Sequence, residues 1–238
     1  MLYAPVVPYI LLIAGTGVYL LGLAFGSLNQ DRTHRSPTWA RMVHSATLVG
    51  AALVWWRGKS VGTDLAGFAT MVFWGMLFSF VGDLLMARVV PLPKYPIPGM
   101  AAFGVAHVLY ILGYVRAGTA LGLGSGLAWG IGVGAGLLLA VVLWWVLIRA
   151  PDADPVLGYG ALGYALLLGG MAGAAAALAV QQPRFAILAV GALLFLVSDA
   201  ILGNRLFRHN DWFLVGDVVW VLYTAGQSLI VFTLPMVV

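Results

Sequence analysis

Long apolar runs separated by short polar breaks make up the chain. The breaks, among them NQDRTHRSP, WRGKSVGTD and RAPDADP, hold most of the charge and proline. A membrane-spanning helix needs about 20 consecutive apolar residues, whereas a membrane β-strand needs about 10 residues of alternating polarity. The runs therefore predict eight transmembrane helices, at roughly residues 5–27, 38–56, 63–87, 99–116, 121–148, 156–180, 184–206 and 212–236.

The composition supports this interpretation, because 62% of the residues are hydrophobic and only 8% are charged. A soluble domain has about 45–50% apolar and about 25% charged residues. No basic residue precedes the first apolar run, so we predict a retained membrane span there and not a cleavable signal. The predicted fold class is all-α: a single integral membrane domain over residues 1–238, built as a bundle of eight transmembrane helices whose glycines allow close packing.

The charges in the breaks predict the topology. Eight spans place both termini on one side, and eight of the 12 Lys and Arg residues lie on the other side, in the breaks or near the adjoining span ends. The positive-inside rule makes that cation-rich side cytoplasmic. We therefore predict a multi-pass protein of the bacterial inner membrane with both termini extracytoplasmic. The net charge is +4, and we expect the cations of the loops to face lipid headgroups. No nucleic acid partner is expected.

Five ionisable residues inside the apolar runs share a similar depth. At about 1.5 Å per helical residue, Asp83, Asp199 and Asp217 lie about 8–9 Å from the cation-rich side, and His107 lies about 12 Å from it. His44 lies nearer to that side. A charge that faces lipid at the centre of a helix costs roughly 2.5–3.5 kcal/mol, so such residues normally face the bundle interior. The shared depth predicts a polar pocket that opens to the cation-rich side.

A purely structural role stays open for three of these residues. Asp217 also fits an interfacial or helix-packing residue, and His107 also fits a buried histidine with satisfied hydrogen bonds. His44 is close to Arg41 and is better explained as an interfacial residue. Asp83 and Asp199 are flanked by long apolar runs, which favours a functional role for both.

The surroundings of these two aspartates also suggest an internal repeat. The segments FVGDLLMA and LVSDAILG align Asp83 with Asp199, and these positions are 116 residues apart, about half the chain. Because four spans separate them, the two halves would have the same orientation. The pattern is consistent with a 4+4 duplication.

Four segments in this order resemble the YhhN-like family of membrane proteins, which includes the animal lysoplasmalogenases: LFSFVGDLLMA, AFGVAHVLYILGY, GALLFLVSDAILGNRLF and VLYTAGQSLIVFTL. The resemblance implies an eight-span bundle that hydrolyses the vinyl ether bond of lysoplasmalogens. The products would be a fatty aldehyde and a glycerophospho-ethanolamine or -choline. The family's paired aspartates correspond to Asp83 and Asp199. The other positions that match the family's pattern are His107, Tyr110, Asn204, Tyr223 and Gln227.

This chemistry suits two neighbouring carboxyl groups. A vinyl ether is hydrolysed by protonation of its β-carbon, addition of water to the oxocarbenium ion, and collapse of the hemiacetal. The reaction needs one protonated acid and one ionised carboxylate, and two buried aspartates close together favour that division. We expect Asp83 and Asp199 to share the two roles, and the sequence does not assign them. His107 or Asp217 is expected to orient the water.

The expected partner is a single-chain phospholipid within a lipid bilayer. Its phosphate would be held by cations at the mouth of the pocket, with Arg205, Arg208, Arg88 and Lys94 as candidates. No cofactor and no metal ion are expected, because the sequence has no cysteine and no His-x-x-x-His spacing. The oligomeric state is left open.

Three other functions fit parts of the pattern. A proton- or cation-coupled transporter of a small amphipathic solute is the main alternative, although the aspartates lie off the membrane midplane and no span has a proline in its middle. An intramembrane aspartyl protease would need Gly-x-Gly-Asp, and this chain has Phe80 at the first of these positions. A structural bundle predicts that both aspartates are dispensable.

Overall fold

The computed structural model describes residues 6–150 and 154–237, and within these residues it contains helices and connecting turns but no strand. The long helices are α1 (Val7–Phe25), α2 (Thr38–Trp55), α3 (Ala66–Met86), α4 (Ile97–Ala120), α5 (Gly126–Leu143), α6 (Pro155–Gln181), α7 (Ala186–Arg208) and α8 (Val215–Phe232). A short helix, α9 (Leu234–Val237), follows. One turn of π-helix extends α2 (Trp56–Ser60) and α5 (Trp144–Ile148), and a 3₁₀ turn (Pro183–Phe185) precedes α7. The all-α prediction is confirmed for this part of the chain.

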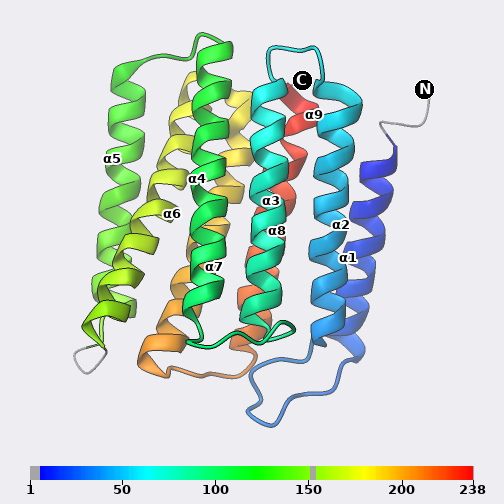
Figure 1. Ribbon diagram of the computed structural model, residues 1–238, viewed down its shortest axis with the longest axis vertical. Coiled ribbons are helices and arrows are strands. Elements are labelled where there is room, and N and C mark those ends of the chain that lie inside the picture. The colour runs from blue at the N-terminus through cyan, green and yellow to red at the C-terminus, as the bar shows by residue number, and fades with distance from the viewer. Residues whose placement is uncertain (1–5, 151–153, 238) are drawn as a thin grey trace.

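The long helices run side by side, and the start of α1 and the end of α8 lie at the same end of the bundle (Figure 1). The loops after α1, α3 and α7, residues 26–37, 87–96 and 209–214, lie together at the opposite end (Figure 1). We call that end the cation-rich end. The alternation agrees with the predicted up-and-down order of the helices.

Seven of the described helices are long and apolar enough to cross a membrane, which indicates a multi-pass membrane protein. The exception among the long helices is α2, whose Arg41, His44 and Ser45 lower its mean hydropathy. It nevertheless packs between α1 and α3. The count of eight spans therefore stays a prediction.

One predicted boundary is wrong. The break expected after residue 116 does not occur there, because α4 continues to Ala120. The chain turns instead at residues 121–125, where Gly122 has a φ of +67°. Glycine adopts this left-handed conformation without the steric cost that a side chain would add. The turn is therefore set by glycine and not by the polar residues before it.

The predicted close packing of glycines is clearest between α5 and α6. A Cβ atom on Gly136 of α5 would lie 2.2 Å from the carbonyl oxygen of Gly169 on α6. The two backbones are in direct contact, as in small-residue interfaces of membrane helices. A Cβ atom on Gly134, two positions earlier, would meet nothing within 4 Å.

We expect Gly136→Ala to destabilise the protein by about 1–3 kcal/mol, because the added methyl group forces the two backbones apart. Gly134→Ala is the matched control on the same helix, and it should leave stability unchanged or slightly higher. Thermal unfolding of both variants in detergent measures the difference. Equal melting temperatures for the two variants would contradict the close α5–α6 contact.

The helix contacts follow the same order in the two halves. α1 packs on α2, α2 on α3 and α3 on α4, and likewise α5 packs on α6, α6 on α7 and α7 on α8. Between the halves, α4 contacts α6 and α8 contacts α2, which are equivalent pairs under a shift of four helices. An origin of this pattern in duplication stays a prediction.

Candidate active site

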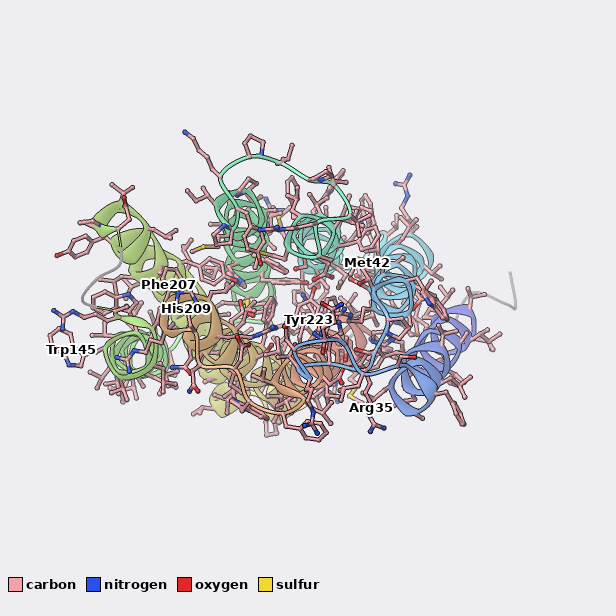
Figure 2. All side chains as sticks on the ribbon, turned by 90° about the horizontal axis from the view of Figure 1, so that it is seen from below. Arg35, Met42, Trp145, Phe207, His209 and Tyr223 are labelled. Atoms are coloured by element: carbon pink, nitrogen blue, oxygen red, sulfur yellow. The ribbon has the colours of Figure 1, made fainter. Side chains whose placement is uncertain are left out.

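Asp83 of α3 and Asp199 of α7 line the same cavity, which has a volume of about 280 Å³. Its walls come from α2, α3, α4, α7 and α8, and they extend to His34 and Tyr95 in the loops of the cation-rich end. Figure 2, a view from this end, shows Tyr223 near the middle of the bundle. The two aspartates therefore share a cavity that reaches the cation-rich end.

Asp83 of α3 is hydrogen-bonded to side chains from two other helices, α2 and α8. It is 3% exposed, and its Oδ2 atom accepts hydrogen bonds from the hydroxyl groups of Ser45 on α2, at 2.5 Å, and Tyr223 on α8, at 2.9 Å. Behind Tyr223, the side-chain nitrogen of Gln227 lies 3.4 Å from the Tyr223 hydroxyl, to which it donates. The hydroxyl of Tyr110 donates to Oε1 of Gln227 at 2.8 Å. A hydrogen-bonded chain thus runs from Tyr110 to Asp83.

Asp199 has a similar but shorter chain of partners. Its Oδ2 atom accepts a hydrogen bond from the hydroxyl of Tyr164 on α6. The same hydroxyl lies 3.2 Å from Nε2 of His107 on α4, and the His107 side chain is fully buried. Each aspartate is therefore positioned by a tyrosine, and each tyrosine contacts a second buried polar side chain.

Asp199 also lies at a boundary between polar and apolar surroundings. Besides the cavity that Arg41 and Asp83 line, it lines an apolar pocket of about 40 Å³ with Met100, Phe103 and Phe207. A further apolar pocket of about 20 Å³ adjoins it on the side of Leu168. A molecule with one polar and one apolar end could therefore place its junction at Asp199.

Asp217 lies outside the residues that line the cavity. Its Oδ2 accepts from the backbone N–H of Arg35 at 2.6 Å, and its Oδ1 accepts from the backbone N–H of Ser36 at 3.1 Å and from the Ser36 hydroxyl. The carboxylate is 3% exposed and stands in the first turn of α8, where a negative charge is favoured. Asp217 therefore fastens the loop between α1 and α2 to α8.

Asn204 and Arg208 fasten the end of α7 to the end of α5. The side-chain nitrogen of Asn204 donates to the carbonyl oxygen of Leu147 at 2.6 Å. The guanidinium of Arg208 donates to the carbonyl oxygen of Arg149 at 2.9 Å. Neither residue is among those that line the polar cavity.

Of the other cations predicted at the mouth of the pocket, Arg205 is among the residues that line the cavity, and Arg88 and Lys94 are not. Arg205 lines the cavity, pairs with Asp211 and donates to the Thr33 hydroxyl at 3.2 Å. Arg88 lies over the Tyr95 ring, 4.2 Å from its centroid, and shares a separate surface hollow with Lys94.

Sequence reasoning missed three side chains of this region, namely Ser45, Tyr164 and Arg41. Ser45 and Tyr164 are single hydroxyl groups inside apolar runs, a weak signal. Arg41 had a stronger signal, because it lies inside the predicted second span. It lines the cavity although only 9% of its surface is exposed.

Two histidines lie near Arg41, His44 on α2 and His34 in the loop before it, and His44 differs from the expectation. His44, expected at the interface, is 2% exposed, and among the described residues neither of its ring nitrogens has a hydrogen-bond partner. Its ring lies 5.8 Å from the Tyr19 ring on α1. In the loop, burial and then the positive charge of Arg41 lower the pKa of His34. His34 is therefore largely neutral at pH 7.

A family model described as the YhhN family matches residues 38–234. No curated protein and no solved structure matches the chain. Within the described residues, no group of three His, Cys, Asp or Glu side chains is placed to hold a metal ion.

Proposed function

The chain belongs to the YhhN family, and from that premise we propose that it is a membrane hydrolase that cleaves the vinyl ether bond of lysoplasmalogen-type lysolipids. The observation that carries the proposal is the position of Asp199, where the cavity shared with Asp83 meets two apolar pockets. In a lysoplasmalogen the vinyl ether joins the polar glycerophospho group to the apolar chain. A lipid with its polar end in the cavity and its chain along the apolar pockets would therefore present the reactive bond to both carboxyl groups.

The orientation of the lipid, with its polar end in the cavity and its chain along the apolar pockets, assigns the roles of the two aspartates. The carbon that must be protonated is the β-carbon, which is the double-bond carbon attached to the chain and not to the ether oxygen. Asp199 lies on the apolar side of the cavity and is the general acid in our proposal. Asp83 does not line the apolar pockets and is the carboxylate that stabilises the oxocarbenium ion and takes a proton from water.

The proposed cycle balances without a cofactor. Asp199 gives its proton to the β-carbon, and the positive charge develops on the carbon–oxygen unit beside Asp83. Water adds to that carbon as Asp83 takes one of its protons, which gives a hemiacetal. In the collapse, Asp83 returns a proton to the glycerol oxygen, and Asp199 takes the proton of the hemiacetal hydroxyl. The aldehyde and the glycerophospho product leave, and both carboxyl groups regain their starting states.

In this proposal the hydrogen-bonded side chains around the two carboxyl groups hold them in position. Tyr164 and His107 orient Asp199, and Tyr223 with Gln227 and Tyr110 orients Asp83. Preorganised hydrogen bonds of this kind reduce the rearrangement that the reaction requires. We assign no water-orienting role to Asp217, because three hydrogen bonds from the loop occupy its carboxylate.

We further propose that α2 crosses the membrane as the eighth span. It lies between α1 and α3, which are both long and apolar enough to cross, so it shares their depth in the bundle. The chain would then form one bundle in the bacterial inner membrane with its cation-rich end in the cytoplasm. The equivalent helix contacts in the two halves support a 4+4 duplication.

Hydrolysis in D₂O gives a specific signature. Because the acid's proton exchanges with solvent, we expect the aldehyde to carry one deuterium on the carbon next to the carbonyl group. Mass spectrometry of the aldehyde released by the purified protein from an alkenyl lysolipid measures this label. The saturated alkyl ether lysolipid of the same chain is the matched control and should give no product.

Two results would contradict the proposal. Aldehyde without deuterium would exclude protonation of the β-carbon as the first step. No aldehyde from any alkenyl lysolipid, together with proton- or cation-driven solute flux in proteoliposomes, would favour the transporter.

A further inference from the structure

Arg41 is a buried cation whose hydrogen bonds are largely unused. Arg41 lines the cavity shared by Asp83 and Asp199, and the residue is 9% exposed. The only hydrogen bond of its side chain within the described residues is a long one of 3.3 Å from Nη2 to the Thr38 hydroxyl, and its buried Nε has no partner there. A guanidinium has five N–H donors, so most of its binding capacity is free.

The neighbouring carboxylates do not serve as its partner. In residues 6–150 and 154–237 the one ion pair is between Arg205 and Asp211. Asp217 is close enough to influence Arg41 but is bound to the loop, and Asp83 is bound to Ser45 and Tyr223. A buried charge without a partner is costly, and proteins that keep one normally supply the counter-charge from a ligand or a partner.

The surroundings of Arg41 fix its position in the cavity. Its guanidinium lies 5.3 Å from the centroid of the Trp220 ring on α8, which holds the planar group against one wall. His34 and Arg205 line the same cavity. The Arg41 part of the cavity is distinct from the apolar pockets at Asp199, whose lining does not include Arg41.

We propose that Arg41 binds the phosphate group of the ligand, with Arg205 as a weaker second cation nearer the loops. The inference rests on the proposed function for the lipid, and it adds which side chain binds the phosphate of the headgroup. A planar guanidinium can bind two phosphate oxygens at once, which a Lys ammonium group cannot do in the same geometry. Arg at this position should therefore favour phosphate-bearing ligands more strongly than Lys would. Arg41 is a binding residue in this proposal and takes no part in bond cleavage.

The test compares two saturated ether lipids of the same chain, a 1-O-alkyl-glycerophosphoethanolamine and a 1-O-alkylglycerol. Neither has a vinyl ether, so binding is measured without turnover, on purified protein in nanodiscs. We expect the wild type to bind the phosphate-bearing lipid more tightly. Arg41→Gln should weaken that binding by about 10- to 100-fold and leave the affinity for the alkylglycerol unchanged, as expected when one charged hydrogen-bonding group is lost.

Two further variants separate charge, shape and stability. Arg41→Lys keeps the charge and should retain part of the preference. Arg57→Gln is the matched control, because Arg57 also lies over a tryptophan ring, 4.9 Å from the Trp56 centroid, but follows the far end of α2 from Arg41. It should bind both lipids as the wild type does. If Arg41→Gln does not fold, the wild-type comparison and Arg41→Lys decide the question.

The outcomes are distinct from those of the hydrolysis assay. Equal affinity of the wild type for the two lipids, or an equal loss for both in Arg41→Gln, would overturn the phosphate site. Binding of inorganic phosphate or glycerophosphoethanolamine as tight as that of the lipid would keep the site but assign it to a soluble phosphate compound. A phosphate preference with no aldehyde release would refute the proposed function alone.

Discussion

Asp83→Asn and Asp199→Asn are each expected to lower kcat for aldehyde release by about 10²–10⁴-fold, the range that a positioned acid or base contributes. Asn has nearly the shape of Asp and can accept the same tyrosine hydrogen bond, but it neither gives nor takes the required proton. Because each role is needed in the same cycle, the double variant should be little worse than either single variant. Aldehyde release by purified protein measures all three.

The stability of these variants is part of the prediction. Asp83 is buried, and replacing a buried ionisable group with a neutral one of the same size should not destabilise the bundle. Melting temperatures should therefore stay near that of the wild type while the activity is lost. Asp64→Asn is the matched control, since Asp64 is exposed in the turn between α2 and α3 and should leave both quantities unchanged. A single variant that keeps more than a tenth of kcat would exclude its aspartate from the chemistry.

Hydropathy predicted most of the fold because the helices that fit a membrane have sustained apolar sequences. The exceptions have local physical reasons. α2 carries Arg41 and His44, which lower its mean hydropathy although both side chains are buried inside the bundle. The turn after α4 depends on the conformation of Gly122, and composition does not reveal backbone conformation.

The candidate site was predicted in part. Their similar depth predicted that Asp83 and Asp199 lie toward one end of the bundle, and in the structure both line one cavity. Depth does not give the direction of a side chain, however, and Asp217, which has a similar depth, binds the loop between α1 and α2. Asn204 and Arg208, which were predicted on other grounds, bind the end of α5. The contacts of Tyr164 and Ser45 depend on which helices pack together, which one sequence does not reveal.

Asp217→Ala should have the opposite effect to Asp83→Asn: a large loss of stability, of about 2–4 kcal/mol. The substitution removes the acceptor of three hydrogen bonds and leaves the backbone N–H groups of Arg35 and Ser36 without a partner. The Ser36 group is buried, and a buried group without a partner costs about 1–3 kcal/mol. The loop between α1 and α2 would detach from α8, beside the cavity wall at His34. Thermal unfolding in detergent measures the loss.

Ser36→Ala is the graded control for this prediction, because it removes one of the three hydrogen bonds and should cost about 1 kcal/mol. For Asp217→Ala, kcat measured below the melting temperature should fall much less than in Asp83→Asn, because the carboxylate of Asp217 does not reach the cavity. The two aspartates, both 3% exposed, would then separate cleanly into one that serves the reaction and one that serves the fold. A loss of kcat equal to that of Asp83→Asn with no change in melting temperature would return Asp217 to the catalytic group, and it would require the loop to release it during turnover.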